Sequence, residues 1–481
     1  MVTNGTRMTV LGGVAGAAFL ALTALFAASL GAAQNQNQSS AQNPYFGSVT
    51  TTAARPDVMP ISLDDAIRMA LEKNLALTLT QQDEGIAHAQ KLEALAPMLP
   101  TVTGEASTGV HQYNLAAQGF RPGLVHSLSP GAIPMVVVVD VTSAQANYSQ
   151  TLFDASQIAS YRSARANEEA ARFDTQSSRG LVVLAVGTTY LQAVAAASRV
   201  EYARALLRTD EVLLNQAVEQ HKAGVVANLD ELRARVIYQS QQQTVIAAEN
   251  SFEKAKIALN REIGLPAEQK IALSDAAPYQ DLATITVEEA QQQAYRSRQD
   301  YLSMQSQVKA AQLHRNAARY ERLPTLSFGG NYGVTGITGG LYHGTFAAVG
   351  SLNLPLFEEG KLRGDRAVAE AQLGSAMSQL ADMRSKIDAQ LRDSLLDVQS
   401  SQDLVRVAQS NIGLATKTLE QVTDRYQAGI DDNLPVVEAQ STLANAQSQL
   451  VDSLYRYNQA KLGLARNLGI VDTQYKVYLG R

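Results

Sequence analysis

The 481-residue chain contains no cysteine and no tryptophan. Without cysteine it can form no disulfide, no thiolate metal site and no thiol nucleophile. It also has no residue that could accept a thioether-linked lipid near its amino terminus. Any aromatic residues at a membrane boundary must therefore come from its 18 tyrosines and 10 phenylalanines.

The chain has no excess of positive charge either. Its 40 Lys+Arg and 45 Asp+Glu residues give a formal net charge of -5, without a basic cluster that would bind nucleic acid. Gly329-Gly330 is not followed by the Lys-Ser/Thr of a phosphate-binding loop, and no serine lies in a nucleophile elbow. We therefore expect neither an enzyme nor a bound metal or cofactor. The six histidines lack metal-ligand spacing: His88, His111, His126, His221, His314 and His343.

Residues 1–33 have a composition of their own, with Arg7 followed by an apolar run to about Leu30 and then small residues. This pattern is typical of a secretory signal peptide cleaved near Ala33. The alternative is an uncleaved membrane anchor, because the run is long enough to cross a bilayer. Residues 34–60 are rich in Gln, Asn, Ser and Thr, and we expect them to be flexible. No later segment looks apolar enough for a membrane helix.

The remainder of the chain contains an internal duplication. Downstream motifs recur at a constant spacing of 205 positions: Ala223-Gly224 and Ala428-Gly429, Arg261 and Arg466, Gly264 and Gly469. Upstream, Leu99-Pro100-Thr101 recurs as Leu323-Pro324-Thr325, now 224 positions apart. About twenty extra residues, rich in Gly and Pro, therefore lie between Gly104 and Phe153 and are predicted to form a long loop.

The duplication predicts the domain organisation of the chain. The first structural repeat covers residues 61–265 and the second covers 285–470, with a linker over 266–284 and a C-terminal tail over 471–481. Each repeat is expected to contain a helix, a β-hairpin, a very long helix and a shorter helix. The expected helices are about 62–95, 155–221, 230–263, 286–322, 359–427 and 435–468. The expected strands are about 101–111, 136–153, 326–334 and 345–357.

Two of these patterns constrain the assembly. The long helical segments are rich in Ala, Gln and Leu and contain no proline, which favours coiled coils over a compact globule. The strands alternate small or apolar residues with polar ones, which predicts one wet and one apolar face. Four strands cannot close a barrel, and an open sheet cannot lie in lipid because its edge amides would be unsatisfied. Since the smallest membrane barrels have eight strands, several copies of the chain must share one barrel.

A specific resemblance rests on three motifs: the strand entries marked by Pro100 and Pro324, the strand exit Leu354-Pro355-Leu356-Phe357, and the Ala-Gly turn before an Asn-Leu helix start, which occurs twice. Over residues 61–470 the chain resembles the TolC-like outer-membrane efflux proteins. The resemblance implies a mainly helical fold with membrane β-structure: a long antiparallel coiled-coil helical barrel, continuous with a 12-stranded outer-membrane β-barrel shared by a homotrimer with four strands per chain. It also implies a location in the outer membrane of a Gram-negative-type bacterium, with a periplasmic extension.

In this family, acids just beyond the glycine turns ring the closed periplasmic end of the tunnel. The resemblance assigns this gate to Asp230 and Glu438, with Arg233 able to pair with Glu438 across neighbouring coils. Pro435 occupies a second acidic position, so a double ring is not expected. The alternative is that these residues are ordinary helix-start charges on a solvated face.

Other candidate residues follow from the same resemblance. Asp431 and Asp432 are either pore-mouth acids or capping acids of the last helix. The turns Ala223-Gly224-Val225 and Ala428-Gly429-Ile430 resemble docking points for a periplasmic adaptor, and they also match glycine helix ends. Aromatic girdles at the membrane boundaries could be formed by Tyr113, Tyr148, Phe153, Phe328, Tyr332, Tyr342 and Phe357.

The predicted function is a trimeric outer-membrane channel-tunnel that passively conducts small molecules as the exit duct of a tripartite efflux pump. The implied partners are a periplasmic adaptor (membrane fusion protein), an inner-membrane pump of RND, ABC or MFS type, and outer-membrane lipid. One alternative is an exit duct for type I protein secretion. A second, from another class, is a structural coiled-coil tether or adhesin without a pore.

Overall fold

The computed structural model describes residues 47–49, 53–117, 134–275, 279–282, 285–431 and 433–479. The expected signal peptide and most of the glycine- and proline-rich loop lie outside these residues. The chain forms two compact units. Unit 1 draws on Met1–Gln81, Thr175–Gln299 and Lys386–Arg481, and unit 2 on Gln82–Asp174 and Asp300–Ser385. Each unit therefore takes segments from both halves of the duplication.

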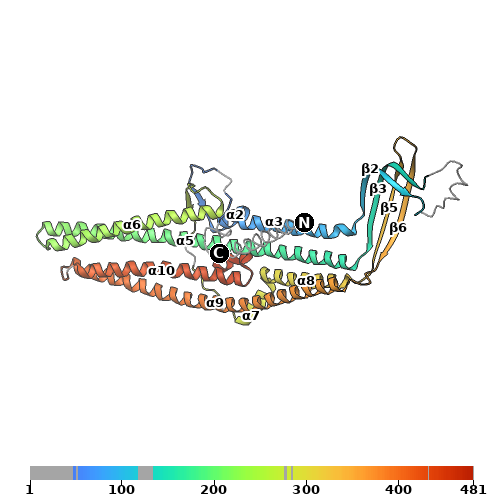
Figure 1. The fold of residues 1–481 in the computed structure, drawn as a ribbon. Helices are drawn as coiled ribbons and strands as arrows, with labels where there is room; N and C mark the ends of the chain where they lie inside the picture. The colour runs from blue at the N-terminus through green and yellow to red at the C-terminus, as the bar shows by residue number, and fades with distance from the viewer. Residues whose placement is uncertain are drawn as a thin grey trace, which may run out of the picture. The chain divides into compact units, whose positions relative to one another are not determined.

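Unit 2 contains a four-stranded antiparallel sheet (Figure 1). Its strands are β2 (Thr101–Asn114), β3 (Val136–Phe153), β5 (Thr325–Ile337) and β6 (Tyr342–Asn353), in the order β2-β3-β5-β6. Both predicted hairpins are confirmed, and they join through the pairing of β3 with β5. Within the described strands, β2 and β6 are the two edges of this sheet.

The strand register places the large aromatic residues of β5 and β6 on one face, together with Tyr148 of β3. Tyr148 lies opposite Gly330, which lies opposite Ala348, while Tyr332 lies opposite Phe346. Tyr332 and Phe346 are 74% and 79% exposed in the single chain. The other face carries polar pairs such as Asn147 with Asn331. An exposed apolar face of this size on one side of a sheet requires a covering apolar medium.

The helices are α2 (Leu63–Lys73), α3 (Leu75–Leu95), α5 (Ala155–Lys222), α6 (Asn228–Ile263), α7 (Val287–Ser297), α8 (Gln299–Tyr320), α9 (Glu359–Gln427), α10 (Leu434–Asn467) and α11 (Val471–Leu479), with a 3-10 turn at Ala96–Met98. The two very long helices and the two shorter helices that follow them agree with the predicted ranges. The structure adds α11, which the sequence pattern left as a tail.

Two predicted helices, over 62–95 and 286–322, are wrong as continuous helices. Each is interrupted, at Asn74 and at Arg298, where the backbone is extended. The buried Asn74 side chain restarts the helix, since its Oδ1 accepts a hydrogen bond of 2.9 Å from the amide of Ala76. The amide of Leu75 is taken by the carbonyl of Gly47 at 3.1 Å. Tertiary contacts therefore stabilise a break that contains neither Gly nor Pro.

The predicted helix starts are confirmed at the level of their caps. Ser62 Oγ accepts the amide of Asp65 at 3.1 Å, and Thr286 forms a complete capping box with Glu289. Beyond these caps, unit 1 contains a small parallel pair that was not predicted, between β1 (Met59–Ile61) and β4 (Ile271–Leu273). It joins the polar segment before the first repeat to the linker between the repeats.

The core of unit 1 forms where α2, α5, α6, α10 and α11 meet. Tyr190 on α5 is 1% exposed, and its hydroxyl donates to the carbonyl of Ile61 at 3.1 Å. By length and composition, this part of α5 is long and apolar enough to cross a membrane. The expectation that no segment after the first 33 residues is apolar enough for a membrane helix is therefore corrected. Most of that stretch is buried inside the chain. We interpret it as the core helix of unit 1.

Candidate functional site at the helical turns

The α5–α6 and α9–α10 connections have the same backbone geometry. Gly224 and Gly429 have φ of 73° and 70°, in the left-handed region. In each turn the glycine amide donates three residues back, and the next amide donates five residues back, at 2.9–3.0 Å. This is the Schellman helix end, which satisfies the last free carbonyls. It leaves Val225 and Ile430 with 73% and 66% exposure, so each turn ends in an exposed apolar side chain.

The two turns are linked to each other within unit 1. The hydroxyl of Tyr426, in the last turn of α9, donates to Oε1 of Gln220 at 3.0 Å. On the other side, Nδ2 of Asn433 donates to the backbone carbonyl of Asp230 at 3.1 Å. Both bonds connect positions just over 200 residues apart in the sequence. The tip of each α-hairpin is therefore held in place by the other.

The structure brings together two of the three predicted gate residues. Asp230 is mostly covered, and its carboxylate lies 3.7 Å from Arg233 Nη1, one helical turn away. Glu438 is exposed on α10, and its carboxylate has no partner in the described part of the chain. Arg233 therefore pairs with Asp230, and within one chain it does not meet Glu438.

Tyr426 was not identified from the sequence, although it lies between the two turns. Burial raises the pKa of its hydroxyl, and the nearby carboxylate of Asp230 raises it further. The hydroxyl therefore stays protonated as a hydrogen-bond donor. The only available signal was an aromatic residue in the last helical turn before Gly429, a position where aromatics are unexceptional.

Of the two candidate pore-mouth acids, Asp431 is described and Asp432 lies outside the described residues. Asp431 accepts two hydrogen bonds from Arg425, at 2.6 and 3.2 Å. This guanidinium holds the pKa of Asp431 below its ordinary value. The N-cap of α10 is Asn433, whose side chain makes no capping bond. Asp431 therefore closes the turn through an ion pair and does not cap the helix.

A second charged group near the first turn also went unpredicted. Glu231 lies 2.7 Å from both His221 and Arg235. These partners, His221 first, lower the pKa of Glu231. The group connects the end of α5 to the start of α6 and leaves Glu231 ionised around neutral pH. The spacing of Glu231 and Arg235 on one helix face was the signal that could have revealed it.

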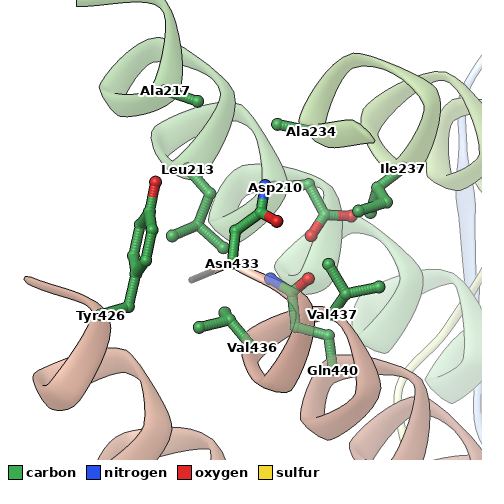
Figure 2. Close-up of a pocket in the computed structure, with 10 residues that line it drawn as sticks. All are labelled: Asp210, Leu213, Ala217, Ala234, Ile237, Tyr426, Asn433, Val436, Val437 and Gln440. Carbon is green, nitrogen blue, oxygen red and sulfur yellow. The ribbon is translucent and has the colours of Figure 1, made fainter. Parts of the chain in front are cut away.

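Behind the turns lies a small cavity of about 20 Å³ between α5, α6 and α10 (Figure 2). It is lined mainly by apolar side chains, with the polar side chains of Asp210, Asn433 and Gln440 turned into it. Asp210 is 5% exposed, and burial raises the pKa of its carboxyl to about 6. In the sequence it stands between Thr209 and Glu211, where it reads as a solvated charge.

The predicted girdle aromatics separate into three groups. Tyr148, Phe328, Tyr332 and Tyr342 share the apolar face, and the rings of Tyr148 and Phe328 meet edge-on at 5.9 Å. A β-bulge after Thr151 brings Phe153 opposite Leu326, onto the same face. Tyr113 pairs with Val137 and points to the other face, because it lies an odd number of residues after Val102, the residue of β2 opposite Tyr148. Phe357 follows β6 and is 90% exposed.

Among the described residues, no group of three or more His, Asp or Glu side chains could hold a metal ion. The arrangement at the turns can exchange hydrogen bonds and charge pairs between two α-hairpins. It presents no nucleophile next to a base.

The model of the outer membrane efflux protein family matches residues 66–265 and 285–470. The chain belongs to this family. Among its relatives, the pyoverdine export outer membrane protein OpmQ of Pseudomonas putida is 25% identical over 430 residues, which cover 85% of each chain. The outer membrane protein TolC of Escherichia coli is 22% identical over 355 residues, or 70% of this chain and 71% of TolC.

The fold agrees with this family. The outer membrane channel MtrE of Neisseria gonorrhoeae, solved in an open state, superposes with a TM-score of 0.71 at 18% identity, over 88% of this chain and 94% of MtrE. The predicted fold class, long helices combined with membrane strands as in TolC-like channels, is therefore confirmed.

Family membership determines the class of function. The protein is an outer membrane efflux channel of the TolC type, the exit duct of an efflux pump, and not an enzyme. Its location is the outer membrane of a Gram-negative bacterium. Members of this family work as trimers with an adaptor and an inner-membrane pump. The alternative of an exported tether without a pore is set aside.

Proposed function

We propose that three copies of the chain close one twelve-stranded barrel and passively conduct small molecules out of the cell. The observation that carries this proposal is the open sheet of unit 2, with edge strands β2 and β6 and an exposed apolar face. Edge amides cannot remain unpaired in lipid, so β2 of one copy must pair with β6 of the next. Three four-stranded sheets exceed the eight strands that the smallest membrane barrels need.

Small molecules are the favoured cargo. A relative that aligns over most of its length is named for pyoverdine export. The chain contributes no energy source of its own, so transport must be driven by an inner-membrane pump of RND, ABC or MFS type, through a periplasmic adaptor. The alternative cargo is a secreted polypeptide of a type I system, which the same duct could accommodate.

The test combines assembly with transport. We expect a heat-resistant oligomer in outer-membrane fractions that conducts ions in planar bilayers. Deletion of the gene should sensitise cells to small amphiphilic compounds while leaving the secreted proteins unchanged. Loss of a secreted protein, with unchanged sensitivity, would favour the type I alternative. A stable water-soluble monomer would contradict the channel itself.

We propose that Asp230, Arg233 and Glu438 form the periplasmic gate. Three-fold symmetry would bring three copies of each carboxylate close together, and the Asp230–Arg233 pair at 3.7 Å holds one of them in a fixed position. The backbone carbonyl of Asp230 is already bonded to Asn433, so neutralising its side chain leaves that contact intact.

Neutralising both acids, as D230N with E438Q, should raise single-channel conductance severalfold in planar bilayers. The change removes the charges that hold the closed end together while preserving side-chain shape. Glu219→Gln is the control, since Glu219 is exposed near the same turn and pairs with Lys222 one helical turn away. Equal conductance in wild type and double variant would count against the gate.

We propose that the turns Ala223–Val225 and Ala428–Ile430 dock the adaptor. Both present an exposed apolar residue next to a left-handed glycine, and a Cβ added to that glycine would have no neighbouring atom within 4 Å. The two turns are nearly identical in shape, so one adaptor motif could recognise both.

Gly224→Val combined with Gly429→Val should weaken cross-linking to the adaptor at least severalfold, while trimers persist. Valine disfavours the left-handed backbone and changes the shape of each turn, but its Cβ has no neighbouring atom within 4 Å. Site-specific cross-linking with the adaptor and gel analysis of the oligomer measure the two effects. If trimers disappear as well, the turns have a structural role instead.

Other assignments remain proposals. The girdle is proposed for the five aromatics on the apolar face: Tyr148, Phe153, Phe328, Tyr332 and Tyr342. The signal peptide over 1–33 and the division into repeats at 61–265 and 285–470 remain predictions, as does a pore-mouth role for Asp431.

A further inference from the structure

The cavity behind the turns contains buried hydrogen-bonding atoms that have no partner. Three buried side-chain atoms facing it have no partner in the described part of the chain: Asp210 Oδ1, Asn433 Oδ1 and Gln440 Nε2. Two of them are acceptors when Asp210 is ionised, and the donor among them is the Gln440 amide nitrogen, which carries two N–H groups. Neither acceptor receives a hydrogen bond from it, so an ionised Asp210 would be a buried charge with an unsatisfied oxygen.

No basic side chain lines the cavity. Asp210 lies on α5, facing Ala234 and Ile237 of α6, Tyr426 of α9, and the start of α10 with its N-cap Asn433 (Figure 2). Of these lining residues, Tyr426 is the only other titratable one, and its hydroxyl donates to Gln220. The nearest charged neighbours along the chains are engaged elsewhere or exposed: Asp230 with Arg233, and Arg208, Glu211 and Glu438.

A proton on Asp210 would remove the buried charge and add a hydrogen-bond donor to the cavity. The carboxylic acid would donate its O–H to Asn433 Oδ1, and its other oxygen would accept from Gln440 Nε2. A cavity of about 20 Å³ is also large enough for one water molecule, which could relay either bond. An ionised carboxylate in the same place has no counter-ion in the cavity lining, which is a costly arrangement for a buried charge.

We propose that Asp210 is a proton-operated lock that joins α5 to α10 behind the two turns. Protonation tightens the contact between the two α-hairpins, and ionisation loosens it. The lock is a property of the helical packing in unit 1. Its effect on the gate rests on the proposed function.

The direction of the pH effect follows from the carboxyl group. Burial raises the pKa of Asp210 from 3.8 to about 6, and the neighbouring Gln440 amide offsets only part of this rise. The folded hairpins therefore keep the proton to a higher pH than the separated ones. Their contact is strongest below about pH 4, weakens as the pH rises to about 6, and stays weak above it. The partners of Glu231 and Asp431 lower the pKa of both carboxyls, so they titrate at lower pH than Asp210.

Hydrogen exchange of the purified full-length oligomer tests the lock without any need for conduction. Protection of amides in 205–222 and 434–445, corrected for intrinsic exchange, should fall between pH 4.5 and 7.5 in the wild type. With pKa values of 3.8 and about 6, the fall over this pH range is limited to about thirtyfold. Asp210→Asn is uncharged and carries an N–H donor at every pH, so its protection should be high and independent of pH.

Glu211→Gln is the matched control, because it removes the same charge from an exposed neighbour and should leave the wild-type pH dependence unchanged. Equal pH dependence in wild type and D210N would overturn the proposal. If D210N does not assemble, Gln440→Leu replaces it. Removal of the amide should then move the midpoint of the transition to a higher pH than in the wild type. An unchanged midpoint would also contradict the proposal.

Planar-bilayer recordings of the same proteins connect the lock to the gate. We expect wild-type conductance to rise severalfold from pH 5 to pH 7.5, and D210N to remain at the low level. Absence of any conductance, with the exchange result intact, would contradict the proposed channel function and leave the lock standing. If conductance rises equally in D210N, the protonation of Asp210 does not control the gate, and the effect on conductance that we assign to the lock is overturned.

Discussion

Gly333→Val is expected to abolish the outer-membrane oligomer. Gly333 lies in β5 between β3 and β6, opposite Gln145 and Thr345. A Cβ at this position would lie 2.2 Å from the carbonyl oxygen of Ala144 and 2.6 Å from Cα of Gln145. Both are backbone atoms, so no side-chain rotation relieves the clash.

The consequence should be large because of where the strand lies. To admit valine, β3 must move away from β5, and the ladder hydrogen bonds around Gly333 would be broken. In a lipid environment each unsatisfied amide or carbonyl costs several kcal/mol, with no water to replace its partner. We expect the amount of heat-resistant oligomer in outer-membrane fractions to fall by at least tenfold.

Gly350→Val is the matched control. It lies in β6 of the same sheet, on the apolar face, and a Cβ there has no atom within 4 Å. Valine is favoured in strands and would add apolar surface toward the lipid. This variant should assemble at wild-type levels. If G333V also assembled at wild-type levels, β3 and β5 could not approach each other as closely at Gly333 as they do in this structure.

Gly469→Ala should destabilise unit 1 strongly. Gly469 ends α10 with φ of 77°, and its Cβ would lie 2.6 Å from the backbone nitrogen of Arg298 and from the carbonyl carbon of Ser297. The left-handed backbone costs alanine about 1–2 kcal/mol. Forcing the two backbones apart adds about 1–3 kcal/mol. We expect a clear fall in the melting temperature and new proteolysis near Arg298.

Gly429→Ala separates these two contributions. Gly429 has φ of 70° and the same pair of helix-end hydrogen bonds, but its Cβ would meet nothing within 4 Å. It should therefore show only the backbone cost. Equal destabilisation by G469A and G429A would mean that the contact with Arg298 contributes nothing.

The sequence alone predicted features that depend on local chemistry. Apolar periodicity separated strands from helices, and helix-end signals at Ser62, Thr286, Gly224 and Gly429 placed the ends of helices close to where the structure has them. The constant spacing of the repeated motifs identified the duplication. The family resemblance followed from the order of these signals, and the family model now confirms it.

Local chemistry could not predict the helix breaks at Asn74 and Arg298. Neither position contains Gly or Pro, and each break meets a distant segment: the amide of Leu75 bonds to Gly47, and Gly469 lies close to the backbone at Arg298. The same holds for the pairing of β1 with β4 and for the face on which Tyr113 lies. A shift of one residue in register reverses a strand's faces, and a bulge such as that before Phe153 is set by the partner strand.

At the candidate site, the sequence by itself located the two glycine turns, because a left-handed helix end requires glycine almost regardless of its surroundings. Only the tertiary structure decided that Asp230 pairs with Arg233, that Tyr426 joins the two hairpins, and that Asp210 is buried. The ionisation of a carboxyl depends on the groups and the solvent around it in space. For Asp210 those groups come from helices more than 200 residues further along the chain as well as from its own neighbourhood.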